Sequence, residues 1–290
     1  MNPYYVTGFV DGEGSFPVLV LKRPAYKTSW NVIPVFTISM HIRDQALLEK
    51  IQCFFGGIGK ISFRKKDNVV YYSVKSVKEI MKVIIPHFEK YPLLTEKQID
   101  FELFKKIVTM MFKKEHLTEE GLNKIINIKS ALNKGLTPLL TQSFPSTILM
   151  ERPPRKSTFS KVNPYWITGF VEAEGCFFIN TIKSDAYKLG YQVRLELSVV
   201  QHIRDKILMA NFVNFFNSGA LYENTGHVTY KASKLSDINE IIIPHFKEYP
   251  LQGYKFIDFE KFCSVALLMQ NKEHLTREGL DKIIEIKNSK

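Results

Sequence analysis

One stretch of this chain occurs twice: NPYYVTGFVDGEG at residues 2–14 returns as NPYWITGFVEAEG at residues 163–175. Each copy predicts a short helix, because Asn is a preferred N-cap, Pro fits the first helical position and Gly ends helices. Small residues recur four positions apart, as at Gly8 and Gly12. This spacing leaves a groove in which two helix backbones can approach closely. We therefore expect the two helices to pack against each other.

Each copy also ends in two acids, Asp11 and Glu13 in the first and Glu172 and Glu174 in the second. The dipole of a helix disfavours an anion in its last turn by roughly 0.3–1 kcal/mol. Packing of the two helices would moreover bring Glu13 and Glu174 close together. Such an arrangement makes sense if cations lie between the carboxylates; the alternative is two solvated acidic helix ends without a special function.

The repeat extends over most of the chain. Gly8 returns as Gly169, an offset of 169 − 8 = 161, and the same offset relates residues 41–44 to residues 202–205. Farther on, Pro86 returns as Pro244, an offset of 244 − 86 = 158, so the second half lacks 161 − 158 = 3 residues. Two tandem copies of one domain predict a monomer built like a two-fold dimer. We expect a first domain at residues 1–135, a linker at 136–162 and a second domain at 163–290.

Periodicity and turn signals predict an α+β fold. After the motif helix we expect strands at residues 15–23 and 31–40, a helix at 43–55, and a hairpin of strands at 58–65 and 69–75. A capping box at residues 76–79 opens the next helix, which we expect to close at Pro86. A helix at about 95–113 and another capped by Thr118 follow. This order predicts an antiparallel sheet in each copy, with the helices gathered on one face.

Composition narrows the class of partner. The chain has 290 residues, 45% of them hydrophobic and 13% aromatic, which is ample for folded cores. The net charge of +11 favours a polyanionic partner. Lysine greatly outnumbers arginine, as expected of an A·T-rich genome, either that of an organelle or that of an A·T-rich bacterium. No run of residues is apolar enough to span a membrane, and we expect no transit peptide. Three widely spaced cysteines, Cys53, Cys176 and Cys263, indicate a reducing compartment and no zinc knuckle.

The uncovered face of each sheet should carry the alternate polar side chains of its strands. They include Arg, Lys, Gln, Glu, Asn and Ser, the residue types that read base edges in a major groove, into which a β-ribbon fits. A strand of about ten residues spans ~33 Å, about one turn of DNA, so two halves predict an asymmetric site of roughly 20 bp. The predicted DNA-facing residues are Ser15, Arg23, Thr37, Ser39, Lys60, Ser62, Arg64, Tyr71, Ser73 and Lys75, and Asn180, Gln192, Arg194, Glu196, Ser198, Thr229, Lys231 and Ser233. In the linker, Arg152, Arg155, Lys156 and Lys161 are expected near phosphate.

The two motif copies resemble the LAGLIDADG homing endonucleases, in particular the single-chain, two-motif members of fungal mitochondrial introns. The resemblance covers nearly the whole chain. It implies two αββαββα(α) domains whose sheets form a saddle-shaped DNA-binding face. It also implies a mitochondrial enzyme that hydrolyses both strands of a long double-stranded DNA site with divalent metal.

The resemblance implies metal ligands. The acid before the final Gly of each motif would bind metal with the preceding backbone carbonyl: Glu13 with Gly12, and Glu174 with Ala173. Asp11 and Glu172 would then be structural. Oxygen ligands with phosphate and water suit Mg²⁺, with two or more ions bound and Ca²⁺ as a non-catalytic substitute. Paired ions can activate a water and stabilise the leaving oxygen.

The family also surrounds the attacking water with polar or basic side chains. Gln201 fits this role, whereas its counterpart in the first half is Met40, so we expect two chemically unequal half-sites. Lys97 and Lys255 are candidates for a base facing the phosphates; the alternative is that both are ordinary lysines on a helix surface. The seven histidines lack zinc-ligand spacing, and we expect them to be structural or peripheral to DNA.

Two other functions remain open at this stage. The chain could be a splicing maturase that binds its own intron RNA, or a non-catalytic DNA-binding protein of the same fold. Retention of both Glu13 and Glu174 favours the nuclease, because an RNA-binding or DNA-binding protein has no need of them.

Overall fold

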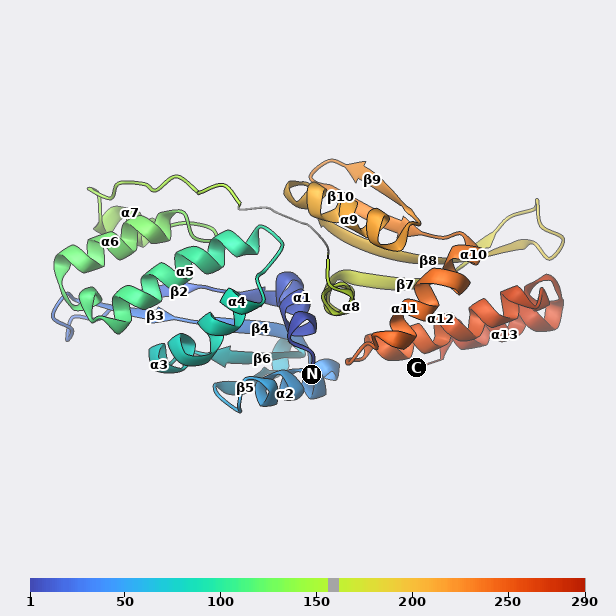
Figure 1. Ribbon diagram of the computed structural model, residues 1–290, viewed down its shortest axis with the longest axis horizontal. Helices are drawn as coiled ribbons and strands as arrows, with labels where there is room; N and C mark the ends of the chain where they lie inside the picture. The colour runs from blue at the N-terminus through green and yellow to red at the C-terminus, as the bar shows by residue number, and fades with distance from the viewer. Residues whose placement is uncertain (156–161, 290) are drawn as a thin grey trace. The chain divides into compact units, whose positions relative to one another are not determined.

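The computed structural model describes residues 1–155 and 162–289, which divide into two compact units, unit 1 at Met1–Thr158 and unit 2 at Phe159–Lys290. Figure 1 shows that each unit combines β-strands with several helices, the two longest of which run next to each other. The α+β class expected from the sequence is confirmed. No helix in the described part of the chain is long and apolar enough to cross a membrane.

The regular elements follow the predicted order twice. Unit 1 contains α1 (Pro3–Glu13), β1 (Gly14–Ser15), β2 (Val18–Lys22), β3 (Trp30–Pro34), β4 (Phe36–His41), α2 (Gln45–Phe54), β5 (Lys60–Arg64), β6 (Val69–Val74), α3 (Val77–Glu79), α4 (Ile85–Lys90), α5 (Lys97–Phe112), α6 (Glu119–Ser130) and α7 (Pro138–Ser143). Unit 2 contains α8 (Pro164–Glu174), β7 (Gly175–Lys183), β8 (Tyr191–His202), α9 (Lys206–Phe216), β9 (Ala220–Asn224), β10 (His227–Ala232), α10 (Leu235–Asp237), α11 (Ile243–Glu248), α12 (Lys255–Gln270) and α13 (Arg277–Asn288).

Each unit holds one four-stranded antiparallel sheet, in the order β1-β4-β6-β5 in unit 1 and β7-β8-β10-β9 in unit 2. One face of each sheet packs under helices, such as α2 against β6 and α9 against β10. The side chains on that face are fully buried, as for Phe36, Tyr72 and Tyr230. The opposite face carries the residues that alternate with them, so the helices cover one side of each sheet, as the sequence predicted.

The first two strands of unit 1 are broken, whereas the sequence led us to expect continuous strands at 15–23 and 31–40. Pro17 separates β1 from β2, and Pro34 ends β3 before Val35, whose N–H bonds to the Pro17 carbonyl at 2.9 Å. β2 and β3 consequently form a separate two-stranded sheet. Proline cannot donate a ladder hydrogen bond, so it interrupts a strand pair. At the equivalent positions unit 2 has Phe178 and Leu195, and β7 and β8 run unbroken.

The helix opened by Ser76 does not close at Pro86, and that expectation was wrong. The Ser76 side chain caps the helix by accepting from the Glu79 N–H. A π-helical segment at Ile80–Ile84 follows, in which the Ile85 N–H bonds to the Ile80 carbonyl, and Pro86 then lies in the first turn of α4. The π turn shifts the hydrogen-bond register just where proline lacks its N–H, so the chain stays helical through it.

The three residues missing from the second half are lost at two turns. Between the start of α2 and the start of β5 the offset falls from 161 to 160, because Gly59 corresponds to Gly219 and 219 − 59 = 160, so one residue is lost there. The β5–β6 turn spans residues 65–68, whereas the β9–β10 turn has only residues 225 and 226. Both losses lie in loops, where changes of length are well tolerated.

The segment predicted as a linker is structured at its start. It contains α7, and Phe144 packs against Trp30 at 5.3 Å between ring centroids. Arg152 pairs with the buried Asp100 at 2.8 Å and also donates to the Ala131 carbonyl, instead of presenting its charge to phosphate as we expected. Lys156 and Lys161 lie outside the described residues.

A buried histidine links the motif helix to the core of each unit. Thr7 Oγ1 donates to the Tyr91 carbonyl at 3.0 Å and lies 3.2 Å from His87 Nε2. Thr168, His245 and Tyr249 repeat this arrangement in unit 2. Burial lowers the pKa of both His87 and His245 from 6.5 to about 4. The histidines therefore stay neutral in the folded protein at neutral pH.

These two histidines should make stability fall with acidity between pH 6.5 and 4. In that window the imidazole of the unfolded chain binds a proton, whereas the buried imidazole stays neutral. The free energy of unfolding therefore falls, as the pH drops, by up to about 1.4 kcal/mol per pH unit for each histidine. Urea unfolding of the wild type and His87→Gln across this range should show a shallower pH dependence in the variant. His227→Gln, at an exposed position, serves as the control and should run parallel to the wild type. Equal slopes for all three proteins would contradict the assignment.

Candidate active site and nucleic-acid interface

The two motif helices end in the same way. Asn2 and Asn163 cap α1 and α8, each accepting from the N–H two residues on at 2.9 Å. The helices stop at Gly14 and Gly175, whose φ angles are −77° and −83°. Left-handed backbone is therefore not the reason for glycine. A Cβ at either position would lie 2.8 Å from the carbonyl oxygen four residues back, too close for any other residue.

The first acid of each motif is buried and satisfied by backbone donors. Asp11 accepts from the N–H groups of Leu94 and Thr95 at 2.8 and 3.0 Å and from the Thr95 hydroxyl at 2.6 Å. Glu172 accepts from the N–H groups of Gln252 and Gly253 at 2.7 and 3.2 Å. These bonds tie the end of each motif helix to the segment before α5 or α12. They agree with the structural role expected for Asp11 and Glu172.

The second acid of each motif is only partly buried, at the last residue of α1 and of α8. Gln201 Nε2, at the end of β8, donates to Glu174 Oε1 at 3.3 Å, and Gln201 Oε1 accepts from the His202 N–H at 3.0 Å. Both ends of the Gln201 amide are thus held, and it orients the Glu174 carboxylate. Met40 occupies the equivalent position before His41 in unit 1 and offers no such donor.

Two lysines bind the carbonyl groups at the same helix ends. Lys97 Nζ donates to the Val10 and Gly12 carbonyls at 3.0 and 2.6 Å. Lys255 Nζ lies 2.9 Å from the Val171 carbonyl and 3.5 Å from that of Ala173. A cation at the C-terminal end of a helix compensates the negative end of its dipole. Neither lysine is therefore an ordinary side chain on a helix surface.

A hard-cation site fits what these residues offer. Each helix end presents a carboxylate and a backbone carbonyl, and the carbonyl already accepts a positive ammonium group. Oxygen donors of this kind suit Mg²⁺ or Ca²⁺. Within the described residues, no group of three or more His, Cys, Asp or Glu side chains gathers into a metal site. Any ion held here would need further ligands from a substrate or from water.

The open face of the unit 1 sheet carries the predicted polar residues in cross-strand rows. Ser15 lies opposite Thr37, which lies opposite Ser73, which lies opposite Lys60. A second row joins Ser39, Tyr71 and Ser62, and Arg64 continues along β5. Paired residues of antiparallel strands lie on the same face, so the register places these side chains together. Arg23 and Lys75 lie just beyond the ends of β2 and β6 and are exposed.

The open face of the unit 2 sheet is less uniformly accessible than we expected. Asn180 pairs with Arg194 across β7 and β8, and Arg194, Gln192, Lys231 and Ser233 are all at least partly exposed. Three of the predicted DNA-facing residues are instead buried, so they were wrongly expected to be open to bases: Glu196, Ser198 and Thr229, at 6%, 5% and 5% exposure. Glu196 is covered by two cations, Arg194 and Lys231.

The sequence reasoning missed four exposed apolar residues on this unit 2 face. The signal that could have found them was their position on the polar face: three of them lie two residues from a predicted polar residue of the same strand, and the fourth lies opposite one on the neighbouring strand. They are Phe178, Ile182, Val200 and Tyr222, each at least 42% exposed. Apolar side chains in a major groove contact the thymine methyl group.

The histidines show no metal-ligand geometry. His41 and His202 accept from the N–H groups of Arg43 and Arg204 and so cap short 3₁₀ turns. His227 lies directly opposite His202 across β8 and β10, and both are exposed. His87 and His245 lie in the core, so these five histidines fit a structural role, and a place at the periphery of DNA stays a prediction.

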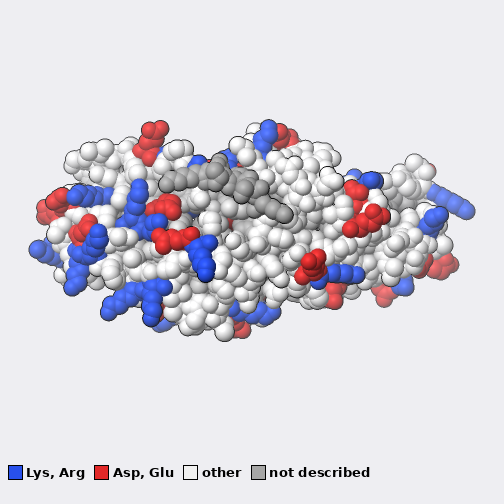
Figure 2. Space-filling view, in the orientation of Figure 1, with Lys and Arg blue, Asp and Glu red and all other residues white. Residues whose placement is uncertain are grey.

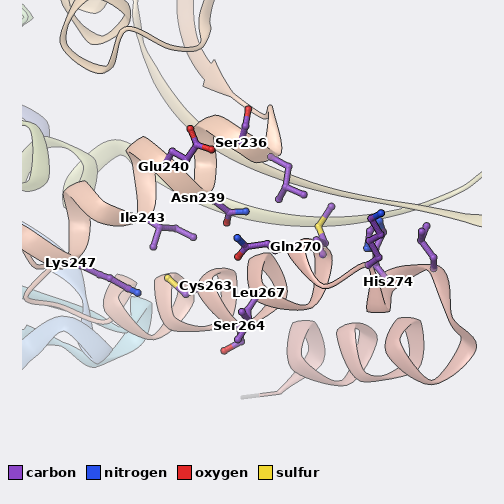
Figure 3. A pocket seen from close by; sticks show the side chains of 14 residues that line it. Ser236, Asn239, Glu240, Ile243, Lys247, Cys263, Ser264, Leu267, Gln270 and His274 are labelled. Atoms are coloured by element: carbon purple, nitrogen blue, oxygen red, sulfur yellow. The ribbon is translucent and has the colours of Figure 1, made fainter.

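A pocket of about 890 Å³ in unit 2 stands apart from all the predicted site residues. Figure 3 shows Asn239, Glu240 and Ile243 on one side of it, and Cys263 and Leu267 of α12 on the other. In unit 1 the counterpart of Cys263, at an offset of 158, is Lys105, which pairs with Glu89 and Glu102 at 3.1 Å. Figure 2 shows basic side chains spread among acidic ones over the surface in view.

The fold and the site define a two-unit α+β protein with a LAGLIDADG motif helix in each unit. The model of the LAGLIDADG endonuclease family matches residues 6–108 and 167–266. The chain belongs to this family, which confirms the resemblance seen in the sequence.

Known relatives and solved structures agree with this family assignment. "Probable intron-encoded endonuclease 2" of Neurospora crassa is 41% identical over 100% of this chain and 65% of its own length, and "Probable intron-encoded endonuclease 3" of the same organism is 39% identical over 98% and 53%. The chain thus spans between half and two thirds of these relatives. The LAGLIDADG homing endonuclease I-SmaMI bound to cleaved DNA matches with a TM-score of 0.95 and 39% identity, over 99% of this chain and 96% of that one. I-LtrWI bound to its target DNA matches with a TM-score of 0.95 and 40% identity, over the same shares.

Replacement of Asp11 by Asn should destabilise unit 1. Asparagine keeps one oxygen acceptor but turns an N–H donor toward backbone N–H groups that need an acceptor, which costs about 1–3 kcal/mol for a buried group. The midpoint of chemical denaturation should fall accordingly. Asp185→Asn, at an exposed position, serves as the control and should shift it little. Equal stability of Asp11→Asn and the wild type would mean that these bonds contribute nothing.

Proposed function

We propose that this chain is a site-specific DNA endonuclease that hydrolyses both strands of an asymmetric double-stranded site of roughly 20 bp, as expected from strand length and DNA pitch. The observation that carries the proposal is the duplicated helix end. In both units a glutamate, a backbone carbonyl and a lysine meet there, beside the open face of an antiparallel sheet. The resemblance to endonucleases whose structures hold DNA supports it.

In this proposal Glu13 with the Gly12 carbonyl, and Glu174 with the Ala173 carbonyl, hold divalent ions. Mg²⁺ is the ion proposed, and Ca²⁺ the substitute that supports binding alone; I-SmaMI bound to an uncleaved DNA target in the presence of calcium is among the similar structures. When bound, such ions supply an activated water and stabilise the leaving oxygen. A carbonyl oxygen has two lone pairs, so Gly12 can accept from Lys97 and still offer a lone pair to a metal.

The remaining residues orient the Glu174 carboxylate and place positive charge at the two helix ends. Gln201 fixes the carboxylate of Glu174 through its 3.3 Å bond, whereas Met40 cannot do so for Glu13, so the two half-sites have unequal chemistry. Lys97 and Lys255 hold a positive charge at each helix end, where a scissile phosphate would need one. The two open sheet faces then provide the base contacts.

Three further points belong to the same proposal. The protein acts as a monomer, because one chain already carries both copies of the motif. The gene is of mitochondrial origin, supported by intron-encoded relatives in fungi and a lysine-rich composition. A maturase that binds intron RNA remains the second candidate, since the sheet faces and basic charge serve either nucleic acid. The retained pair Glu13 and Glu174 favours the nuclease.

Replacement of Glu13 or Glu174 by Gln should each reduce cleavage of both strands by about a hundredfold or more, as for other groups that stabilise a transition state. Glutamine keeps the size of the side chain but removes the charge that holds a divalent ion. DNA affinity should survive or rise, because a negative charge near phosphate is lost. A supercoiled plasmid carrying the site reports nicked and linear products separately.

The control for this experiment is Glu49→Gln, which removes an exposed acid far along the sequence from either motif and should cleave at the wild-type rate. A Glu13→Gln or Glu174→Gln variant that still linearises the plasmid at that rate would place the chemistry elsewhere. Loss of only one strand's cleavage would mean that each acid serves its own strand.

The metal requirement should separate binding from hydrolysis. Ca²⁺ should support DNA binding with little cleavage and Mg²⁺ should support both, because Ca²⁺ is larger and less demanding in coordination geometry. Gel-shift and cleavage assays in Ca²⁺, Mg²⁺ and EDTA provide the measurement. Full cleavage in EDTA would exclude the proposed metal ligands.

A further inference from the structure

Unit 2 contains a buried acid on the sheet face that is proposed to meet DNA. The Glu196 side chain is 7% exposed, yet it lies among residues that point away from the helices, because it alternates along β8 with Leu195 and Leu197 of the core. Its carboxylate accepts from Arg194 Nη2 at 3.2 Å and lies 3.1 Å from Lys231 Nζ. A buried charge is tolerated when it is paired in this way.

The two cations remain available above the acid. The side chains of Arg194 and Lys231 are 46% and 38% exposed. A guanidinium has five N–H donors, so one bond to Glu196 leaves four for another partner. Lys231 is also bounded by Tyr222, whose ring centroid lies 5.8 Å from Nζ. Glu196 therefore holds both cations, Tyr222 borders Lys231 in addition, and both side chains stay partly exposed.

This arrangement is confined to one of the two repeats. The positions equivalent to Arg194, Glu196 and Lys231 in unit 1 are Ile33, Val35 and Ser73, of which none is charged. The shared architecture therefore does not require the triplet. The buried acid occurs in unit 2 alone. It therefore points to a function specific to unit 2, such as reading a DNA sequence different from the one read by unit 1.

We propose that Glu196 is a positioning residue for specificity: it fixes Arg194 and Lys231 in the geometry with which they read guanine, and it does not contact a base itself. This inference rests on the proposed DNA-binding function. A long flexible side chain can bind phosphate in many orientations, whereas bidentate recognition of guanine needs a fixed guanidinium plane. The carboxylate also opposes binding of these cations to phosphates, so it disfavours non-specific DNA.

The test begins with the wild-type cleavage site, obtained by sequencing products from a randomised DNA library. Binding in Ca²⁺ is then measured for every single base-pair change of that site, with wild type, Arg194→Ala, Lys231→Ala, Glu196→Gln and the double variant Arg194→Ala/Glu196→Gln. Glu196→Gln should reduce preference about tenfold at the base pairs affected by Arg194→Ala or Lys231→Ala and raise affinity for random DNA. The double variant should lose no more preference at the Arg194 position than Arg194→Ala alone.

Glu223→Gln is the matched control. It removes the same charge from the same unit, but Glu223 pairs with Lys206 of α9 at 2.7 Å, on the helix side of the sheet. It should leave the profile of base preference as in the wild type, and thermal melting of each variant reports whether the fold is intact.

Three outcomes would overturn the proposal. An unchanged profile in Glu196→Gln would show that the cations need no positioning. A loss at a base pair unaffected by Arg194→Ala and Lys231→Ala would make Glu196 itself a base contact. A uniform loss at all positions with a lowered melting temperature would make it a structural residue. Failure of the wild type to select any DNA site would instead refute the proposed function, independently of Glu196.

Discussion

The negative end of the motif helix is the constraint on which each unit depends. In each unit two acids lie in the last turn of the motif helix, where the helix dipole already disfavours anions. Each unit offsets this unfavourable charge in two ways. Backbone N–H groups solvate the buried Asp11 or Glu172, and Lys97 or Lys255 neutralises the carbonyl groups of the last turn. These bonds come from the segment that leads into α5 or α12, so the long helix of each unit is tied to the motif. The remaining acid, Glu13 or Glu174, is only partly buried at the last residue of the helix.

The two units share these contacts at the end of the motif helix and differ in their sheets. Unit 1 has prolines that split its first strands, and its sheet face carries small polar side chains in regular rows. Unit 2 has continuous strands of 9 and 12 residues, a buried acid between two cations, and several exposed apolar groups on the same face. Duplication thus preserved the helix end and let the sheet faces diverge, as expected of a protein that reads an asymmetric site.

A similar contrast separates chemistry from recognition in the proposed function. Near the motif, Asp11 and Glu172 accept from backbone N–H groups, and Lys97 and Lys255 donate to backbone carbonyl groups. The groups on the sheet face are held by side chains, as Arg194 and Lys231 are by Glu196. Side-chain contacts can change by single substitutions without disturbing the sheet, so recognition can vary while the helix ends stay the same.

The sequence alone determined the repeat, the α+β class, the family and the two acid pairs, because these follow from local signals: caps, alternation, turn residues and a motif repeated with few changes in the second half. The division into structural acids and candidate ligands was implied by the resemblance to the family, and the ligand role stays a prediction. Tertiary structure decided what depends on contacts between distant segments. It showed that Pro17 and Pro34 break strands together, that Pro86 is accommodated by a π turn, and that Arg152 binds Asp100. It also showed that Glu196, polar and correctly placed by alternation, is buried. Alternation specifies which way a side chain points, whereas the side chains around it decide what covers it: here Arg194 of the same strand and Lys231 of the neighbouring strand.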